Sequence, residues 1–277
     1  LESHLEIGDV ADQPAEVALA RRIQREVEKL LATEGYFSPR VSLRRDGEEL
    51  LLEVDPGGRA LIGSVRVDIH GEVDAARRQE LVDGWKLKVG RPFRQADWDE
   101  AKDSLLAGLL AVDHAGARLQ ESSAEVDPEA LRVELLVVAE AGPRYRFGEL
   151  QISGLQRYDP SLVARFNRSV RPGDAYREDQ LLALQVALQS TPYFSSVSVS
   201  LQRSAADGEA AAANDGWVTA AVLLQLRERA PYQVTLGVGY STNTGARVEA
   251  AYRNSDFLDR AWQLQTGVRI EQLRQSG

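Results

Sequence analysis

Few residues in the chain have the types and spacing that chemistry at a site requires. None of the 277 residues is a cysteine, so a disulfide, a zinc–thiolate site and a thiol nucleophile are excluded. The three histidines, His4, His70 and His114, fall in three different segments, and their spacing indicates neither a metal triad nor a Ser-His-Asp relay. The sequence therefore predicts no catalytic residue, no metal site and no cofactor, and favours a protein that is not an enzyme.

Two further patterns are weak candidates for a site. Asp97, Glu100 and Asp103 share one face of a predicted helix and could act as paired carboxylates. Acidic residues near a helix N-terminus are also favoured by the helix dipole, so we interpret them as a solvated face. Gly237-Val238-Gly239 is similar to part of a nucleotide-binding loop, but it lies inside an alternating segment with no lysine after it. We interpret it as part of a strand.

The composition indicates a folded protein that does not bind nucleic acid. Lysine and arginine total 33 against 42 acidic residues, for a net charge of −9, so the chain as a whole repels nucleic acid and anionic headgroups. Apolar residues make up 43% of the chain, which is enough for packed cores in two or three domains. No apolar run approaches the roughly 20 residues of a membrane-spanning helix.

Residues 143–230 have the pattern of one complete small domain in the order β-α-α-β-β. Asp159 and Pro160 are suited to a helix start, because aspartate can accept from a free N–H group and proline needs no partner at the first helical position. Leu181, Leu184 and Leu188 then lie on one side of a second helix. The predicted strands are residues 145–155, 193–199 and 217–224, and the longer helix is 177–189.

Residues 58–142 repeat this pattern. Ile62–Val67 aligns with Phe147–Ile152, and Val89–Arg94 aligns with Pro172–Arg177. The predicted elements are a short helix at 74–85, a long helix from Asp97 as its N-cap to Leu110, and strands at 61–67, 117–122 and 131–138.

Residues 1–57 repeat only the second half of the unit. An apolar stripe predicts a helix over 15–33, and Asp46-Gly47 predicts a hairpin between strands near 41–43 and 50–54. We therefore expect a first domain that lacks its opening strand. The predicted fold class is α+β, with two helices over a three-stranded sheet in each complete unit.

Residues 231–277 have a different pattern. Val234, Leu236, Val238 and Tyr240 alternate with small or polar residues, and two further alternating runs follow. Strict alternation in segments of about ten residues is typical of transmembrane β-barrel strands, of which the smallest barrels need about eight. We expect the start of a truncated barrel. Its open edge would fold back, be poorly ordered, or pair in a self-association of two copies.

The β-α-α-β-β units resemble polypeptide-transport-associated (POTRA) domains, and three such units before a β-barrel resemble the Omp85 superfamily. The residues that carry the resemblance are Ala139–Gly148, which lead into the last unit, and Gly237–Thr242 in the first barrel strand. The count of three units is most similar to the TamA branch, the translocation and assembly module. Another branch, the two-partner secretion pores, remains the alternative. A neighbouring gene for a large secreted β-helical protein would favour the pore, and one for a very large inner-membrane-anchored protein would favour the assembly module.

The resemblance implies a location and partners. The expected location is the Gram-negative outer membrane, with the POTRA units in the periplasm. The expected partners are an inner-membrane-anchored TamB-like protein and unfolded outer-membrane protein clients such as autotransporters. No nucleic acid partner is implied.

Because no side chains indicate a catalytic or metal site, we expect binding through backbone groups. Sheet edges expose unpaired N–H and C=O groups that an extended segment of another protein can use. We expect one client-pairing edge in the first barrel strand, at Val234, Leu236, Val238 and Tyr240. A second edge, at Val41, Ser42 and Leu43 of the first unit, is the candidate for partner binding because it lies farthest in sequence from the barrel.

Overall fold

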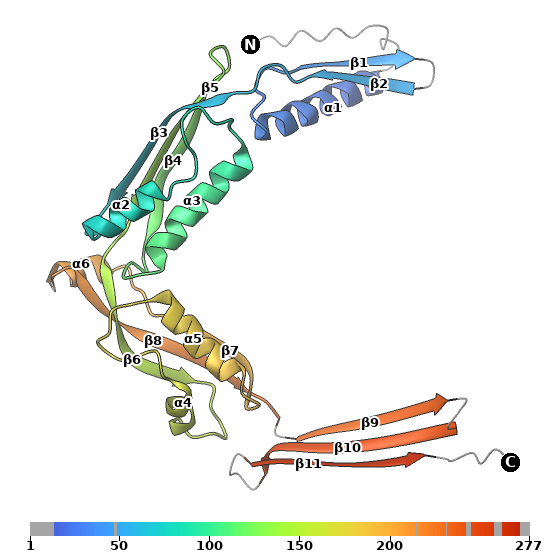
Figure 1. The fold of residues 1–277 in the computed structure, drawn as a ribbon, viewed down its shortest axis with the longest axis vertical. Coiled ribbons are helices and arrows are strands. Elements are labelled where there is room, and N and C mark those ends of the chain that lie inside the picture. Colours follow the sequence, from blue (N-terminus) through green and yellow to red (C-terminus); the bar gives the residue numbers. More distant parts are fainter. Residues whose placement is uncertain are drawn as a thin grey trace. The chain divides into compact units, whose positions relative to one another are not determined.

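The computed structural model describes most of the chain as a series of small mixed sheets and helices (Figure 1). The described residues are 14–46, 49–213, 215–230, 232–241, 245–257 and 262–271. The chain divides into two compact units, Leu1–Arg144 with Ala206–Trp217, and Tyr145–Ala205 with Val218–Gly277. The fold class is α+β, as the sequence predicts.

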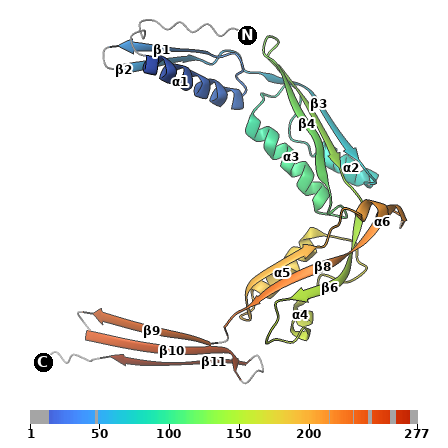
Figure 2. The same ribbon diagram turned by 180° about the vertical axis from the view of Figure 1, so that it is seen from behind.

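The first module contains one helix and one hairpin. Helix α1 (Pro14–Thr33) ends just before Gly35, whose φ of +91° suits the end of a helix. Strands β1 (Arg40–Asp46) and β2 (Glu49–Asp55) pair antiparallel, and α1 runs along the hairpin (Figure 1 and Figure 2). The predicted turn at Gly47 lies outside the described residues.

The second module has the complete order of elements. Strand β5 is the central strand of its sheet, with β3 parallel on one side and β4 antiparallel on the other. Both helices lie on the same face of this sheet (Figure 1 and Figure 2). The elements are β3 (Leu61–His70), α2 (Ala75–Asp83), α3 (Gln95–Leu110), β4 (Arg118–Asp127) and β5 (Arg132–Glu140).

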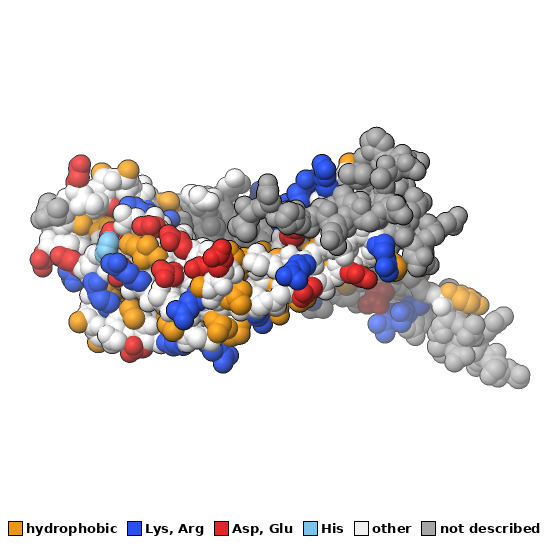
Figure 3. Space-filling model, turned by 90° about the horizontal axis from the view of Figure 1, so that it is seen from above, with side chains coloured by type: hydrophobic (Ala, Val, Ile, Leu, Met, Phe, Trp, Pro, Cys, Tyr) orange, Lys and Arg blue, Asp and Glu red, His pale blue; other side chains and the backbone are white. Residues whose placement is uncertain are grey.

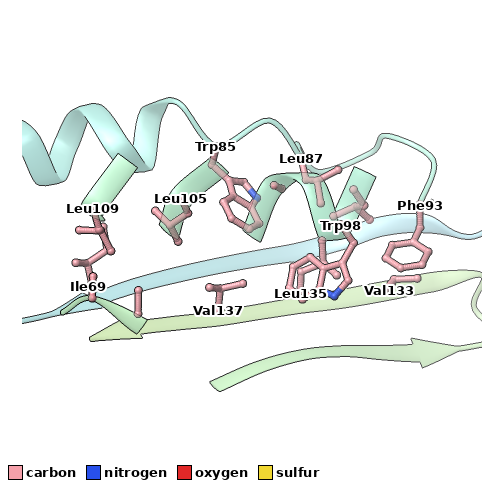
Figure 4. Close-up of a cluster of buried hydrophobic side chains, with 14 of the residues drawn as sticks. Ile69, Trp85, Leu87, Phe93, Trp98, Leu105, Leu109, Val133, Leu135 and Val137 are labelled. Carbon is pink, nitrogen blue, oxygen red and sulfur yellow. The ribbon is translucent and has the colours of Figure 1, made fainter. Parts of the chain in front are cut away.

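The core of this module lies between the helices and β5. Val133, Leu135 and Val137 alternate along β5 and are buried against the helices (Figure 4). Trp85 and Trp98 meet edge to face above them, with ring centroids 6.0 Å apart. Such aromatic pairs stabilise a core beyond the area that they bury.

The starts of the two helices differ. The Asp74 side chain accepts hydrogen bonds from the N–H groups of Ala76 and Arg77 at the start of α2. The prediction that Asp97 caps α3 is wrong, since the helix begins at Gln95 and Arg94 is its N-cap residue. Asp97 instead lies in the first turn, where a negative charge interacts favourably with the helix dipole.

The third module repeats the second. Its sheet has the order β6-β8-β7, and β7 and β8 are antiparallel. The elements are β6 (Arg144–Ser153), α4 (Ser161–Phe166), α5 (Glu178–Gln189), β7 (Phe194–Leu201) and β8 (Trp217–Glu228). One short helix between β7 and β8, α6 (Asp207–Ala213), was not predicted from the sequence.

The two complete modules share a clasp of backbone hydrogen bonds between the first strand and the loop before the long helix. In the second module, the N–H of Phe93 donates to Ala60 O at 3.0 Å and that of Gly90 to Ile62 O at 2.8 Å. In the third, the N–H of Tyr176 donates to Tyr145 O at 2.9 Å and that of Gly173 to Phe147 O at 2.7 Å. This agreement shows that the repeat in the sequence is a repeat in backbone geometry.

The last three strands form a separate antiparallel sheet of order β11-β10-β9. They are β9 (Tyr232–Ser241), β10 (Gly245–Phe257) and β11 (Trp262–Glu271). Consecutive strands pair with each other, so the sheet is an open meander in which β9 and β11 are the outer strands.

Glu228 at the end of β8 connects this strand to the loop that follows β6. Its carboxylate accepts from the N–H groups of Gln156, Arg157 and Tyr158, at 2.9, 3.0 and 3.1 Å. Burial raises the pKa of Glu228, but these N–H groups and the charge of Arg157 outweigh it and leave the pKa below its ordinary value. Hydrogen bonds to a charged group typically contribute about 1.5–3 kcal/mol.

We expect Glu228→Ala to speed hydrogen exchange at these three amides by roughly 10–100-fold, which is the equivalent of that free energy. Because the folded pKa is lowered, the stabilisation is complete at neutral pH and declines as the pH falls below about 4.5, the ordinary value. The exposed Glu149→Ala is the control and should change none of the three rates. Equal protection in both variants would contradict the assignment.

Candidate interaction surfaces

Strand β1, which carries the predicted partner edge, borders a two-stranded sheet. Val41 is buried, Ser42 and Leu43 are half-buried, and the three pair with Val54, Glu53 and Leu52 of β2. Among the described residues β1 pairs with β2 alone, and no described strand pairs with its outer side. The structure therefore places Val41, Ser42 and Leu43 on a border strand.

Strand β2 has a second open side that the sequence reasoning missed. In the complete modules, the strand equivalent to β2 is central and has a neighbour on both sides, as β5 does between β3 and β4. Among the described residues β2 has only β1 as a neighbour, and its apolar Leu52 and Val54 are exposed. The signal was present in the sequence, since Leu50, Leu51 and Leu52 form a run that is apolar on both faces, as central strands are.

The predicted residues of β9 lie on one face of the last sheet. Val234, Leu236, Val238 and Tyr240 alternate in register with the neighbouring strand, and Leu236 and Val238 are 77% and 86% exposed. The cross-strand partners extend this face, since Val238 pairs with Val248 and Val248 pairs with Ile270. The further exposed apolar residues on this face are Tyr232 and Val268.

The opposite face of the same sheet is polar. Arg269 forms an ion pair with Glu249 at 3.3 Å, and Arg253 donates to Gln265 Oε1 at 3.3 Å. Gly239 lies beneath Arg247, where an added Cβ would come 3.7 Å from a guanidinium nitrogen. One face of the sheet is thus apolar and exposed, while the other carries paired charges.

This arrangement differs from that of the sheets in the modules. There, the apolar face is covered by helices, whereas no described helix covers the last sheet (Figure 1). A contiguous apolar surface of this kind is rare on a soluble monomer and marks a contact with a membrane or another protein. On the face of the molecule in Figure 3, by contrast, lysine and arginine side chains are interspersed with aspartate and glutamate.

Ionisable groups come together in one pocket of about 320 Å³ near the start of α3. Its lining includes Lys86 and Glu100, which are 2.5 Å apart, and Arg94, which binds both carboxylate oxygens of Glu34. The hydrogen bond from Lys86 lowers the pKa of Glu100, and that from Arg94 lowers the pKa of Glu34. Both carboxyl groups are therefore ionised at neutral pH and already paired.

The histidines do not converge. His4 lies outside the described residues, His70 is exposed, and His114 is buried after the end of α3. Burial lowers the pKa of His114, and its contacts with the backbone of Gly142 and Pro143 offset this in part. Within the described ranges, no group of three histidine or acidic residues is arranged to hold a metal ion.

None of the described helices is both long and apolar enough to cross a bilayer.

Comparison with known proteins identifies the fold. No family model matches the sequence. BamA from Haemophilus ducreyi lacking POTRA domains 1-3 is similar with a TM-score of 0.57 and 17% identity, over 76% of this chain. The chain spans 37% of that BamA chain. BamA POTRA3-5 from Haemophilus influenzae is similar with a TM-score of 0.50 and 14% identity, over 80% of this chain and 93% of that one. At these identities the likeness is one of fold, and the chain has the fold of the POTRA domains of BamA.

Proposed function

We propose that the chain is the periplasmic part, with the first barrel strands, of an outer-membrane protein assembly factor of the TamA type. The observation that carries the proposal is the last sheet, which has one exposed apolar face and one ion-paired polar face and follows modules with the POTRA fold. This division of faces suits a sheet with lipid on one side and an aqueous interior on the other. The modules would then lie in the periplasm of a Gram-negative cell.

The proposed activity is binding without covalent chemistry. Clients would be unfolded outer-membrane proteins such as autotransporters, whose strands add to a free sheet edge through backbone hydrogen bonds. Strand β9 is suited to this because its second side has no strand partner among the described residues. Backbone pairing makes few demands on sequence, so one edge could serve many clients.

The proposed partner is an inner-membrane-anchored TamB-like protein, bound by the first module. The support is that β1 and β2 each have an open side there, with exposed apolar side chains at Leu52 and Val54. A strand of the partner could complete this sheet and cover those side chains.

The membrane assignment predicts opposite results for neighbouring substitutions on β9. Leu236 faces the apolar side and Thr235 the polar side. An arginine on the lipid face costs about 2–4 kcal/mol near the middle of a bilayer, whereas one on the interior face costs little. We expect Leu236→Arg in the full-length protein to reduce the urea-resistant, outer-membrane fraction at least several-fold and Thr235→Arg to leave it unchanged. Equal effects of the two substitutions would contradict a lipid-facing surface.

The partner assignment predicts that the first module is required for complex formation. Deletion of residues 1–55 should abolish co-purification with the TamB-like protein. The substitution of Leu52 and Val54 together by serine should weaken co-purification without a change in membrane content, because it removes the exposed apolar side chains alone. Arg44→Ser, on the exposed part of β1, is the control. Partner binding that survives the deletion would place the contact elsewhere.

A further inference from the structure

Two buried N–H groups of the second module have no hydrogen-bond partner among the described residues. They are Nε1 of Trp85 and Nε of Arg77. Trp85 is 5% exposed, and its ring packs edge to face against Trp98. Buried polar groups are nearly always paired, because an unpaired group keeps the full cost of its desolvation. These two donors therefore call for an explanation.

Both side chains line the same crevice between α2 and α3, which has a volume of about 120 Å³. Arg77 is anchored there by its other nitrogens, since Nη1 donates to Glu80 Oε2 at 2.7 Å and Nη2 donates to Gly108 O at 2.9 Å. Trp85 belongs to the loop after α2, and its ring lies beside Leu105 of α3 (Figure 4). The two unpaired donors are thus held at one cavity.

The third module does not repeat this arrangement. In the alignment of the two modules, Trp85 corresponds to Arg168, which is exposed. Beside it, Asn167 Nδ2 donates to Val170 O at 2.9 Å, and the N–H of Val170 donates to Asn167 Oδ1 at 3.0 Å. This corner of the third module pairs its own polar groups, so the buried indole is a feature of the second module rather than a requirement of the fold.

The lining of the crevice defines the chemistry of a ligand. An indole N–H and a guanidinium can only donate, and the guanidinium is always charged, so the complementary group is an anionic acceptor. Leu81, Ala101 and Leu105 line the same space and form an apolar wall. The volume equals that of about four water molecules, at roughly 30 Å³ each. A carboxylate with a short alkyl tail meets all of these conditions.

The crevice is also accessible and positively charged. Gly84 and Ser104 line it and are exposed, so a solute can enter from the solvent. Its lining contains two cationic side chains, Arg77 and Lys86, against the single carboxylate of Glu80. This balance favours an anion in a chain whose net charge is −9.

We propose that this crevice binds a small monocarboxylate of the size of acetate or propionate. One carboxylate oxygen accepts from Trp85 Nε1 and the other from Arg77 Nε, and the charges strengthen both hydrogen bonds. The alkyl tail contacts Leu81 and Leu105. Because the ligand lies between α2 and α3, its binding stabilises the folded second module.

The probe for the test is acetate, added to the full chain in a nonionic detergent at constant ionic strength. The chain contains four tryptophans, so labelling of the indoles with ¹⁵N gives few NMR signals, and Trp85→Phe assigns one of them. We expect acetate to move the Trp85 indole proton downfield in a saturable manner, at least fivefold further than that of Trp98, because it gains a charged acceptor. Sodium chloride at the same concentration should move neither signal.

Saturation-transfer NMR on the methyl group of acetate measures binding in each variant. Trp85→Phe keeps an aromatic ring but lacks the N–H, and should weaken binding at least fivefold. Arg77→Gln removes the charge and should weaken binding at least tenfold. The matched control is Trp98→Phe, which removes a buried indole of the same core that does not line the crevice, and should change the affinity less than twofold.

The neutral analogue acetamide tests the charge of the ligand. It has the shape of acetate and should bind at least tenfold more weakly, so equal binding of the two would overturn the carboxylate assignment. A Trp85 indole signal that acetate leaves unchanged would show that the crevice holds water only, which overturns the inference. Equal losses in Trp85→Phe and Trp98→Phe would overturn it as well, since core packing would then determine binding. The proposed assembly function rests on the sheet edges and the last sheet, so it stands under each of these results.

Discussion

The organisation of this chain depends on the need of every strand for hydrogen-bond partners on both sides. In the complete modules, the central strands β5 and β8 each have a neighbour on both sides. The border strands have a described strand on one side only. The helices cover one face of each sheet and contribute the core, but they supply no backbone partners to the borders. The same small architecture that makes a module stable therefore leaves edges that can bind other chains.

In the last sheet, a whole apolar face is exposed in addition to the edges. Its strands pair with one another in the meander, yet no described helix packs against its apolar face. The modules are stable in water because Trp98, Phe147 and their neighbours are buried. Among the described residues, the sheet of β9, β10 and β11 has no comparable buried core.

Much of this structure could be predicted from the sequence. The apolar stripe at Leu181, Leu184 and Leu188 indicates α5, and strict alternation indicates β9, because both periodicities follow from backbone geometry alone. The alignment of residues 58–142 with 143–230 then predicts the same order of elements in the second module. Helix α6 escaped prediction because it is one short alanine-rich segment among polar residues, with no periodic stripe. Strand β4 is longer than predicted. Its charged residues hide the alternation of apolar and polar side chains in the sequence, but its backbone pairs with β5 as far as Asp127.

Side-chain roles were harder to predict than elements. Asp97 has the residue type of an N-cap, but the helix begins two residues earlier, where the clasp at Phe93 fixes the chain. The sequence predicts β2 only as the return strand of a hairpin. Its open side becomes evident when its apolar run, Leu50 to Leu52, is compared with the central strand β5 of the second module.

The clasp before each long helix has a consequence for how such chains diverge over evolution. Its hydrogen bonds run between main-chain atoms, as from Gly173 to Phe147, so they constrain shape while most side chains remain replaceable. Modules that share this clasp could lose most of their sequence identity and still form the same main-chain hydrogen bonds. An identity of only 14% to a structure with the same fold agrees with this, because main-chain hydrogen bonds do not select side chains.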